Sequence, residues 1–134
     1  MDFIGAYSWP NLRYLLQGFW ITVQVAGLSI IFSFIIGTVL GTVRYTRTPF
    51  LSRTTAFFVD IIRNLPLLLI IFFIGMVLPQ TGIRIPTFWA AVVGLSIFEG
   101  AMIAEIVRSG LVSVDKGQIE AARASGLSYL QTLR

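Results

Sequence analysis

The stretch GFWITVQVAGLSIIFSFIIGTVLGTV, residues 18–43, decides the class of fold. No charged residue stands between Arg13 and Arg44, so the run exceeds the roughly 20 apolar residues that a helix needs to cross a bilayer. A secretory signal peptide is the competing interpretation, but its apolar region is only about 7–15 residues long and follows a basic start. Here Asp2 stands near the N-terminus. We therefore predict a retained transmembrane helix.

Two further apolar stretches follow. The second covers about 55–79, and its densest part is LPLLLIIFFIGMVLP from Leu65. The third covers about 86–107 and opens with Pro86, which suits the first turn of a helix because its missing amide proton costs nothing there. The sequence thus predicts an all-α membrane protein with three transmembrane helices, followed by a short cytoplasmic helix.

The composition narrows the possible chemistry. Hydrophobic residues make up 56% of the chain and charged residues 12%, about half the charge that a soluble domain usually carries. Cysteine and histidine are absent, which removes disulfides, thiolate nucleophiles, imidazole bases and most zinc or haem ligands. We expect no catalytic residue, no metal site and no cofactor bound by this chain.

Basic residues predict the orientation in the membrane. The 44–53 loop and the tail after the third span together hold seven of them, whereas the other side of the membrane has two. Cytoplasmic segments carry the excess of Lys and Arg, so the N-terminus and the 80–85 loop are expected outside. The seven are Arg44, Arg47, Arg53, Arg108, Lys116, Arg123 and Arg134, and the two are Arg13 and Arg84.

Small residues mark where helices can touch. Gly37 and Gly41 form a GxxxG pair, and Ala90 and Gly94 have the same spacing in the third span. Such pairs let helix backbones approach closely. We favour packing within the chain over a dimer seam.

Two acidic residues fall within the third span. Glu99 lies deep in it, where a charge costs roughly 2.5–3.5 kcal/mol and needs a partner or a watery cavity. A place on a polar pathway and a buried structural pair are both open for Glu99. Glu105 lies near the cytoplasmic end and has Arg108 three residues on, which favours a structural role.

A break is expected in the second span. Asp60 and Arg63 are neighbours on one helical face and should neutralise each other. Pro66 then interrupts the backbone hydrogen bonds. A break beside charges is tolerated only where protein or a water-filled cavity covers it. Arg63, Pro66, Glu99 and Glu105 are therefore candidates for lining a substrate pathway.

The tail, residues 113–134, predicts two short helices. Asp115 followed by Gln118 resembles a capping box, so one helix should begin near Lys116. Gly126 is a natural stop because glycine adopts the left-handed conformation without steric cost. A second capping pattern, at 128–131, predicts another helix.

Three roles are conceivable for the tail. Its small residues suit close contact with another protein. The alternative is an amphipathic helix that rests on the membrane surface, and physical reasoning without the family resemblance favours this alternative. A DNA-binding helix-turn-helix is rejected, because the second helix offers one basic residue before the chain ends and phosphate binding needs more. We expect no nucleic-acid partner.

The order of motifs resembles one family. Glu120-Ala121-Ala122 with Gly126 four residues beyond is similar to the EAA motif of ABC importer permeases. The longer stretch GQIEAARASGLSYLQTLR looks like the polar amino acid branch, of the glutamine/glutamate type. Gly18 and Thr22, RNLPLL from Arg63, and AEIVRSG from Ala104 also stand at the family's expected places. The resemblance covers nearly the whole chain.

The resemblance implies a permease in the bacterial inner membrane, carrying a polar amino acid. The chain would be the N-terminal part of a type I transmembrane domain of about five spans. ATP and Mg would bind a separate cytoplasmic ATPase, since a P-loop is missing here. An extracytoplasmic binding protein and a second permease, identical or similar, would be partners, with lipid around them. The implied ATPase-coupling residues are Asp115, Gly117, Gln118, Glu120, Ala121, Ala122, Arg123 and Gly126.

Two other classes of function stay open from the residues alone. One is a small regulatory or scaffold protein that recruits a cytoplasmic partner through its tail. The other is a passive channel subunit. ATP-dependent uptake separates the importer from both.

Overall fold

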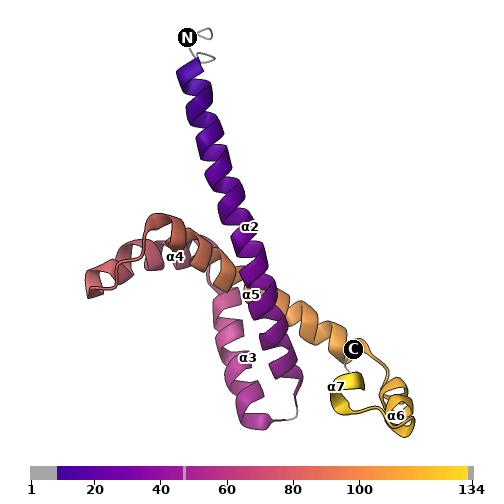
Figure 1. Cartoon of the computed structure of the whole chain (residues 1–134). Coiled ribbons are helices and arrows are strands. Elements are labelled where there is room, and N and C mark those ends of the chain that lie inside the picture. Colours follow the sequence, from indigo (N-terminus) through magenta and orange to yellow (C-terminus); the bar gives the residue numbers. More distant parts are fainter. Residues whose placement is uncertain (1–8, 47, 133–134) are drawn as a thin grey trace.

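The chain is mostly helical in the part that the structure, a computed structural model, describes (Figure 1). Residues 9–46 and 48–132 are described, and no strand occurs among them. Arg47 and Arg134, two of the seven basic residues predicted on the cytoplasmic side, lie outside these residues. The prediction of an all-α membrane protein is confirmed. Its elements are α2 (Trp9–Tyr45), α3 (Pro49–Asn64), α4 (Leu67–Phe72), η1 (Phe73–Val77), η2 (Leu78–Thr81), α5 (Thr87–Ser113), α6 (Lys116–Ala124) and α7 (Tyr129–Thr132).

Helix α2 contains the whole first predicted span and is longer than expected. It has 37 residues, which corresponds to roughly 55 Å at the usual rise per residue. The helix begins well before Gly18 because Pro10 is tolerated in its first turn and nothing after it breaks the helix. Together with α5, it is long and apolar enough to cross a membrane.

The second predicted span, about 55–79, is broken rather than continuous. Helix α3 already begins at Pro49 and ends at Asn64. Leu65 is extended, with φ −89° and ψ 144°, because the ring of the following Pro66 disfavours the helical conformation. The axes before and after the break differ by 100°. The interruption predicted at Pro66 is therefore confirmed, and the pair forms either a bent span or a re-entrant loop.

Helix α5 packs chiefly against α2, and small residues make the contact. Ser29, Ser33, Gly37 and Gly41 recur every fourth residue and are the buried positions of α2. A Cβ on Gly37 would lie 2.6 Å from Cβ of Ile103, and one on Gly41 would lie 2.6 Å from the Ala104 carbonyl oxygen. The GxxxG pair thus packs within the chain, as predicted.

The other small pair, in the first half of α5, faces the broken segment. Ala90 is buried, and a Cβ on Gly94 would lie 2.8 Å from Cγ1 of Ile71 in α4. The Val92 carbonyl accepts hydrogen bonds from Ser96 Oγ at 2.6 Å and, across the helices, from Ser29 Oγ at 3.4 Å. Hydroxyl groups thereby join the helices without exposing polar atoms to lipid.

Helices α2, α3 and α5 meet in a small apolar core. Val59, Ala101 and Ala104 are each at most 1% exposed, and Leu40 and Ile62 pack against them. The next residues along α3 and α5 are charged: Asp60 follows Val59, and Glu105 follows Ala104. The core therefore places two carboxylates at the junction of the three helices.

Candidate functional site

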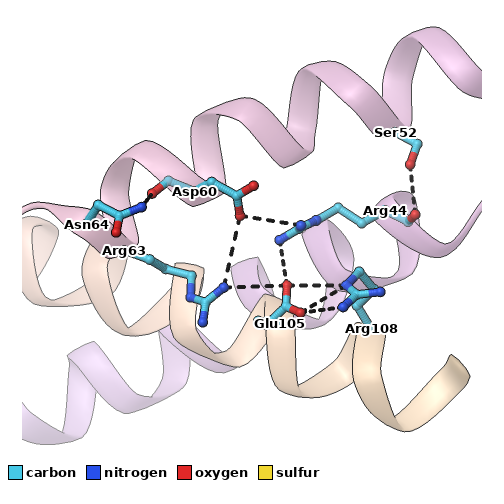
Figure 2. Close-up of polar contacts among 7 residues, drawn as sticks. All are labelled: Arg44, Ser52, Asp60, Arg63, Asn64, Glu105 and Arg108. Carbon is cyan, nitrogen blue, oxygen red and sulfur yellow. Dashed lines mark hydrogen bonds and ion pairs between the residues drawn. The ribbon is translucent and has the colours of Figure 1, made fainter. Parts of the chain in front are cut away.

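Glu105 is the centre of a charge network that joins three helices (Figure 2). Its Oε2 lies 2.8 Å from Nη1 of Arg44, at the end of α2, and 3.6 Å from Nη1 of Arg63, in α3. Nε of Arg108, one turn further along α5, donates to both carboxylate oxygens at 3.1 and 3.2 Å. The predicted Glu105–Arg108 contact is confirmed, and it is one of three.

Asp60 is the second carboxylate of the network. Its Oδ1 lies 3.4 Å from Nη2 of Arg44 and 4.0 Å from Nη1 of Arg63. The predicted Asp60–Arg63 pair therefore exists, but Arg44 is the closer partner. Asn64 Nδ2 donates to the Asp60 carbonyl oxygen at 2.7 Å, so the residues before the break are tied together as well.

The burial of the Arg44 side chain is the largest difference between the structure and the prediction. The sequence places Arg44 among the basic residues that mark the cytoplasmic side, whereas its side chain is only 9% exposed. A signal was present: Arg44 follows Gly37 and Gly41 at helical spacing and so lies on the face of α2 that α5 covers. Ser52 Oγ donates to its carbonyl oxygen at 2.8 Å, which connects the end of α2 to α3.

The buried guanidinium of Arg44 is held by charge rather than by complete hydrogen bonding. Its Nε is buried and has no hydrogen-bond partner within residues 9–46 and 48–132. A buried cation is costly unless it is paired, and here two carboxylates from two other helices pair with it. The position of Arg44 therefore depends on both Asp60 and Glu105.

The four candidate pathway residues do not form one cluster. Arg63 and Glu105 meet in the network, and Pro66 is exposed at the break that follows Arg63. Glu99 is exposed, and among the described residues nothing makes an ion pair or hydrogen bond with it. The buried structural pair considered for Glu99 is absent from this part of the chain, and its role on a pathway stays a prediction.

The tail helix α6 begins and ends as predicted. Asp115 Oδ1 accepts a hydrogen bond from the Gly117 amide at 2.6 Å, which caps the N-terminus. At the other end Gly126 has φ 83°. The amides of Gly126 and Leu127 donate to the carbonyl oxygens of Arg123 and Ala122 at 3.0 and 3.2 Å, the Schellman arrangement that a left-handed glycine permits.

The second capping pattern forms the full reciprocal box, whereas within residues 48–132 Asp115 caps α6 without a side-chain hydrogen bond from Gln118. The Ser128 amide donates to Gln131 Oε1 at 2.9 Å, and the Gln131 amide donates to Ser128 Oγ at 3.4 Å. Helices α6 and α7 lie beyond the end of α5 (Figure 1). Glu120, Ala121 and Arg123 are exposed there. The described residues contain no group of three acidic side chains that could hold a metal ion.

Comparison with known proteins identifies a family and several relatives. The family described as "binding-protein-dependent transport system inner membrane component" matches residues 29–134. The chain is 59% identical to the probable glutamine ABC transporter permease protein GlnP of Bacillus subtilis, over 99% of this chain and 61% of that protein. It is 37% identical to the glutamate transport system permease protein GluD of Corynebacterium glutamicum, over 97% of this chain and 48% of the relative.

Two solved structures share the fold. A crystal structure of an amino acid ABC transporter with histidines matches with a TM-score of 0.85 and 28% identity, covering all of this chain and 62% of that one. An inward-facing structure of the MetNI methionine ABC transporter matches with a TM-score of 0.76 and 30% identity, over 95% and 62% of the two chains. The chain thus spans about 61% of the length of the Bacillus subtilis relative.

Proposed function

Because the chain belongs to the binding-protein-dependent transport system inner membrane component family, we propose that it forms the substrate pathway of an ATP-driven importer of polar amino acids. Its relatives are permease subunits of ABC transporters whose names specify glutamine and glutamate. A substrate of that class, an amino acid with a polar side chain, is the one that this chain is proposed to pass.

The observation that carries the proposal is the exposed helix α6, which ends at Gly126 in the left-handed conformation. The surface of Glu120, Ala121 and Arg123 projects from the end of α5 and is not covered by the spans. A cytoplasmic ATPase that binds this surface would transmit its closure to α5 through the two residues that separate the helices. Asp115 and Gly117 support the contact by capping α6, and Gln118 and Ala122 complete it.

The substrate pathway is proposed to pass the break between α3 and α4. Pro66 leaves the local backbone without regular helical bonding, and free backbone groups at membrane depth are expected to line a cavity. Arg63 lies just before the break, and Glu99 is an exposed carboxylate on α5. Charges of both signs suit a substrate that carries an ammonium and a carboxylate.

The partners and the orientation follow from the same proposal. An ATPase binds α6 on the cytoplasmic side and hydrolyses ATP with Mg, while an amino-acid-binding protein delivers the substrate from outside. A second permease, identical or similar, completes the pathway. The N-terminus then lies outside the bacterial inner membrane, in agreement with the distribution of basic residues.

Charge reversal in α6 tests the proposal. The natural protein is expressed together with its ATPase and its binding protein. Glu120→Lys should then reduce both co-purification of the ATPase and ATP-dependent uptake. Gln80→Lys introduces the same side chain at an exposed position of η2 and should change neither. If α6 instead rested on anionic lipid, Glu120→Lys would strengthen that contact and leave uptake unchanged.

Substrate and class of function are tested by uptake into proteoliposomes. A panel of radiolabelled amino acids should give ATP-dependent accumulation of a polar one. Uptake that equilibrates without ATP would identify a passive channel. Binding of a cytoplasmic protein with no uptake of any amino acid would identify a scaffold.

A further inference from the structure

The charge network and the packing of Val107 next to it are the last attachments of α5 to the other helices. The buried residues of α5 end at Ala104, and Ile106 is already 69% exposed. Beyond this point Val107 contacts Gly41, and Glu105 and Arg108 belong to the network. The remaining turns of α5, up to Ser113, lead directly to α6.

Glu105 fastens α5 to the two neighbouring helices close to the point where α5 leaves the bundle. Its carboxylate binds guanidinium groups from α2, α3 and α5 itself, so a change in the angle between these helices must break at least one contact. Only Val114 and Asp115 separate α5 from α6. A change in the direction of α5 would consequently move α6.

We infer that Glu105 and Arg44 are positioning residues that hold α5, and with it α6, at the angle at which ATP hydrolysis moves the spans. This inference rests on the proposed function. It assigns Glu105 a place in energy coupling instead of contact with the substrate. Arg44 is the partner on which the arrangement depends most, because its buried guanidinium lies closer to both carboxylates than that of the more exposed Arg63.

We expect the bundle to form without the network. Packing of α2 on α5 is made by Gly37, Gly41 and Gly100, none of which belongs to the network. Loss of the Glu105 charge should therefore leave the helices assembled while the end of α5 becomes freer. The expected defect is wasted ATP hydrolysis, since α6 still binds the ATPase but no longer moves the spans with it.

The test uses the protein expressed from its own gene, reconstituted with its ATPase and binding protein. Glu105→Gln keeps the shape and removes the charge. Arg44→Lys keeps the charge, but its compact ammonium replaces the planar guanidinium. Both should retain ATPase co-purification and ATP hydrolysis. Uptake per ATP should fall roughly tenfold for Glu105→Gln, in the range usual for coupled sites, and by less for Arg44→Lys. Arg53→Gln, an exposed arginine of α3, should leave this ratio unchanged.

A distance measurement separates positioning from stability. The chain has no cysteine of its own, so spin labels can be attached to cysteines introduced at Thr54 and Ser113, both exposed. The distance between the two labels changes when the end of α5 moves relative to α3. The distance distribution should broaden in Glu105→Gln and in Arg44→Lys. An unchanged distribution and an unchanged uptake per ATP would overturn the inference, as would loss of assembly in both variants. Failure of the wild-type protein to bind its ATPase or to take up amino acids would instead overturn the proposed function.

Discussion

Arg44 and Glu105 meet at 2.8 Å, Nη1 to Oε2, and this ion pair joins the end of α2 to α5. The two residues are far apart in sequence and come together because the glycines of α2 let the α5 backbone approach. Gly41, one turn before Arg44, lies against the carbonyl of Ala104, the residue before Glu105. Close backbone packing and charge pairing therefore belong to one junction.

Stability should show that Arg44 and Glu105 interact directly. Arg44→Met and Glu105→Gln should each lower the free energy of unfolding by about 1–3 kcal/mol, the usual cost of leaving a buried polar partner unsatisfied. The double variant should lose less than the sum, with a coupling of about 0.5–3 kcal/mol. Unfolding in detergent, followed by circular dichroism, measures all four proteins. Additive losses would show that the two side chains do not depend on each other.

The α2–α5 contact should not tolerate a larger residue at Gly37. A Cβ there would lie 2.6 Å from Ile103 Cβ and 2.8 Å from the Gly100 carbonyl oxygen, so Gly37→Val must push the helices apart. Overpacking of this kind costs about 1–3 kcal/mol, and the melting temperature in detergent should fall. Gly27→Val is the matched control, because no atom lies within 4 Å of a Cβ at Gly27. Equal melting temperatures for the two variants would contradict the packing.

Much of the fold could be predicted because each signal was local. The charge-free run 18–43 predicted α2, and Pro66 predicted the break through its effect on Leu65. The caps of α6 followed from Asp115 and Gly126, whose conformations depend on neighbours only a few residues away. Helix ends were less accurate: α5 continues to Ser113, beyond the predicted 107, because nothing between these positions forbids a helix.

The charge network could be predicted only in part, because it depends on contacts between helices. Asp60 with Arg63 and Glu105 with Arg108 were found from their spacing of three residues along one helix. Arg44 was missed because its partners lie on two other helices. A distribution of basic residues indicates the side of the membrane, but it does not tell which arginine is buried there. The roles proposed for the network residues in transport stay predictions.

The orientation can be measured at the two ends of α5. Thr81, before the helix, and Ser113, at its end, are both exposed, and the chain has no cysteine of its own. An impermeant thiol reagent added to intact cells should label Thr81→Cys and not Ser113→Cys, since the basic residues favour a cytoplasmic tail. Both positions should react after the cells are permeabilised. Labelling of position 113 from outside would reverse the topology.

The stop of α6 should depend on the left-handed conformation of Gly126. With φ at 83°, a β-branched residue at this position is strained by about 1–3 kcal/mol. Gly126→Val should therefore disturb the turn between α6 and α7, including the hydrogen bonds that Gly126 and Leu127 make to the end of α6. Asparagine tolerates this conformation better than other residues with a side chain, so Gly126→Asn should keep the turn.

Comparison of the two variants separates the effect of backbone strain from the effect of steric crowding by an added side chain. A Cβ at Gly126 has no atom within 4 Å, so neither side chain is excluded by crowding and only the backbone strain differs. ATPase co-purification and amino acid uptake should fall in Gly126→Val and stay near the wild-type level in Gly126→Asn, at equal amounts of protein in the membrane. Equal loss in both variants would mean that the partner needs the bare glycine surface. Wild-type behaviour of Gly126→Val would show that the shape of this turn plays no part in coupling.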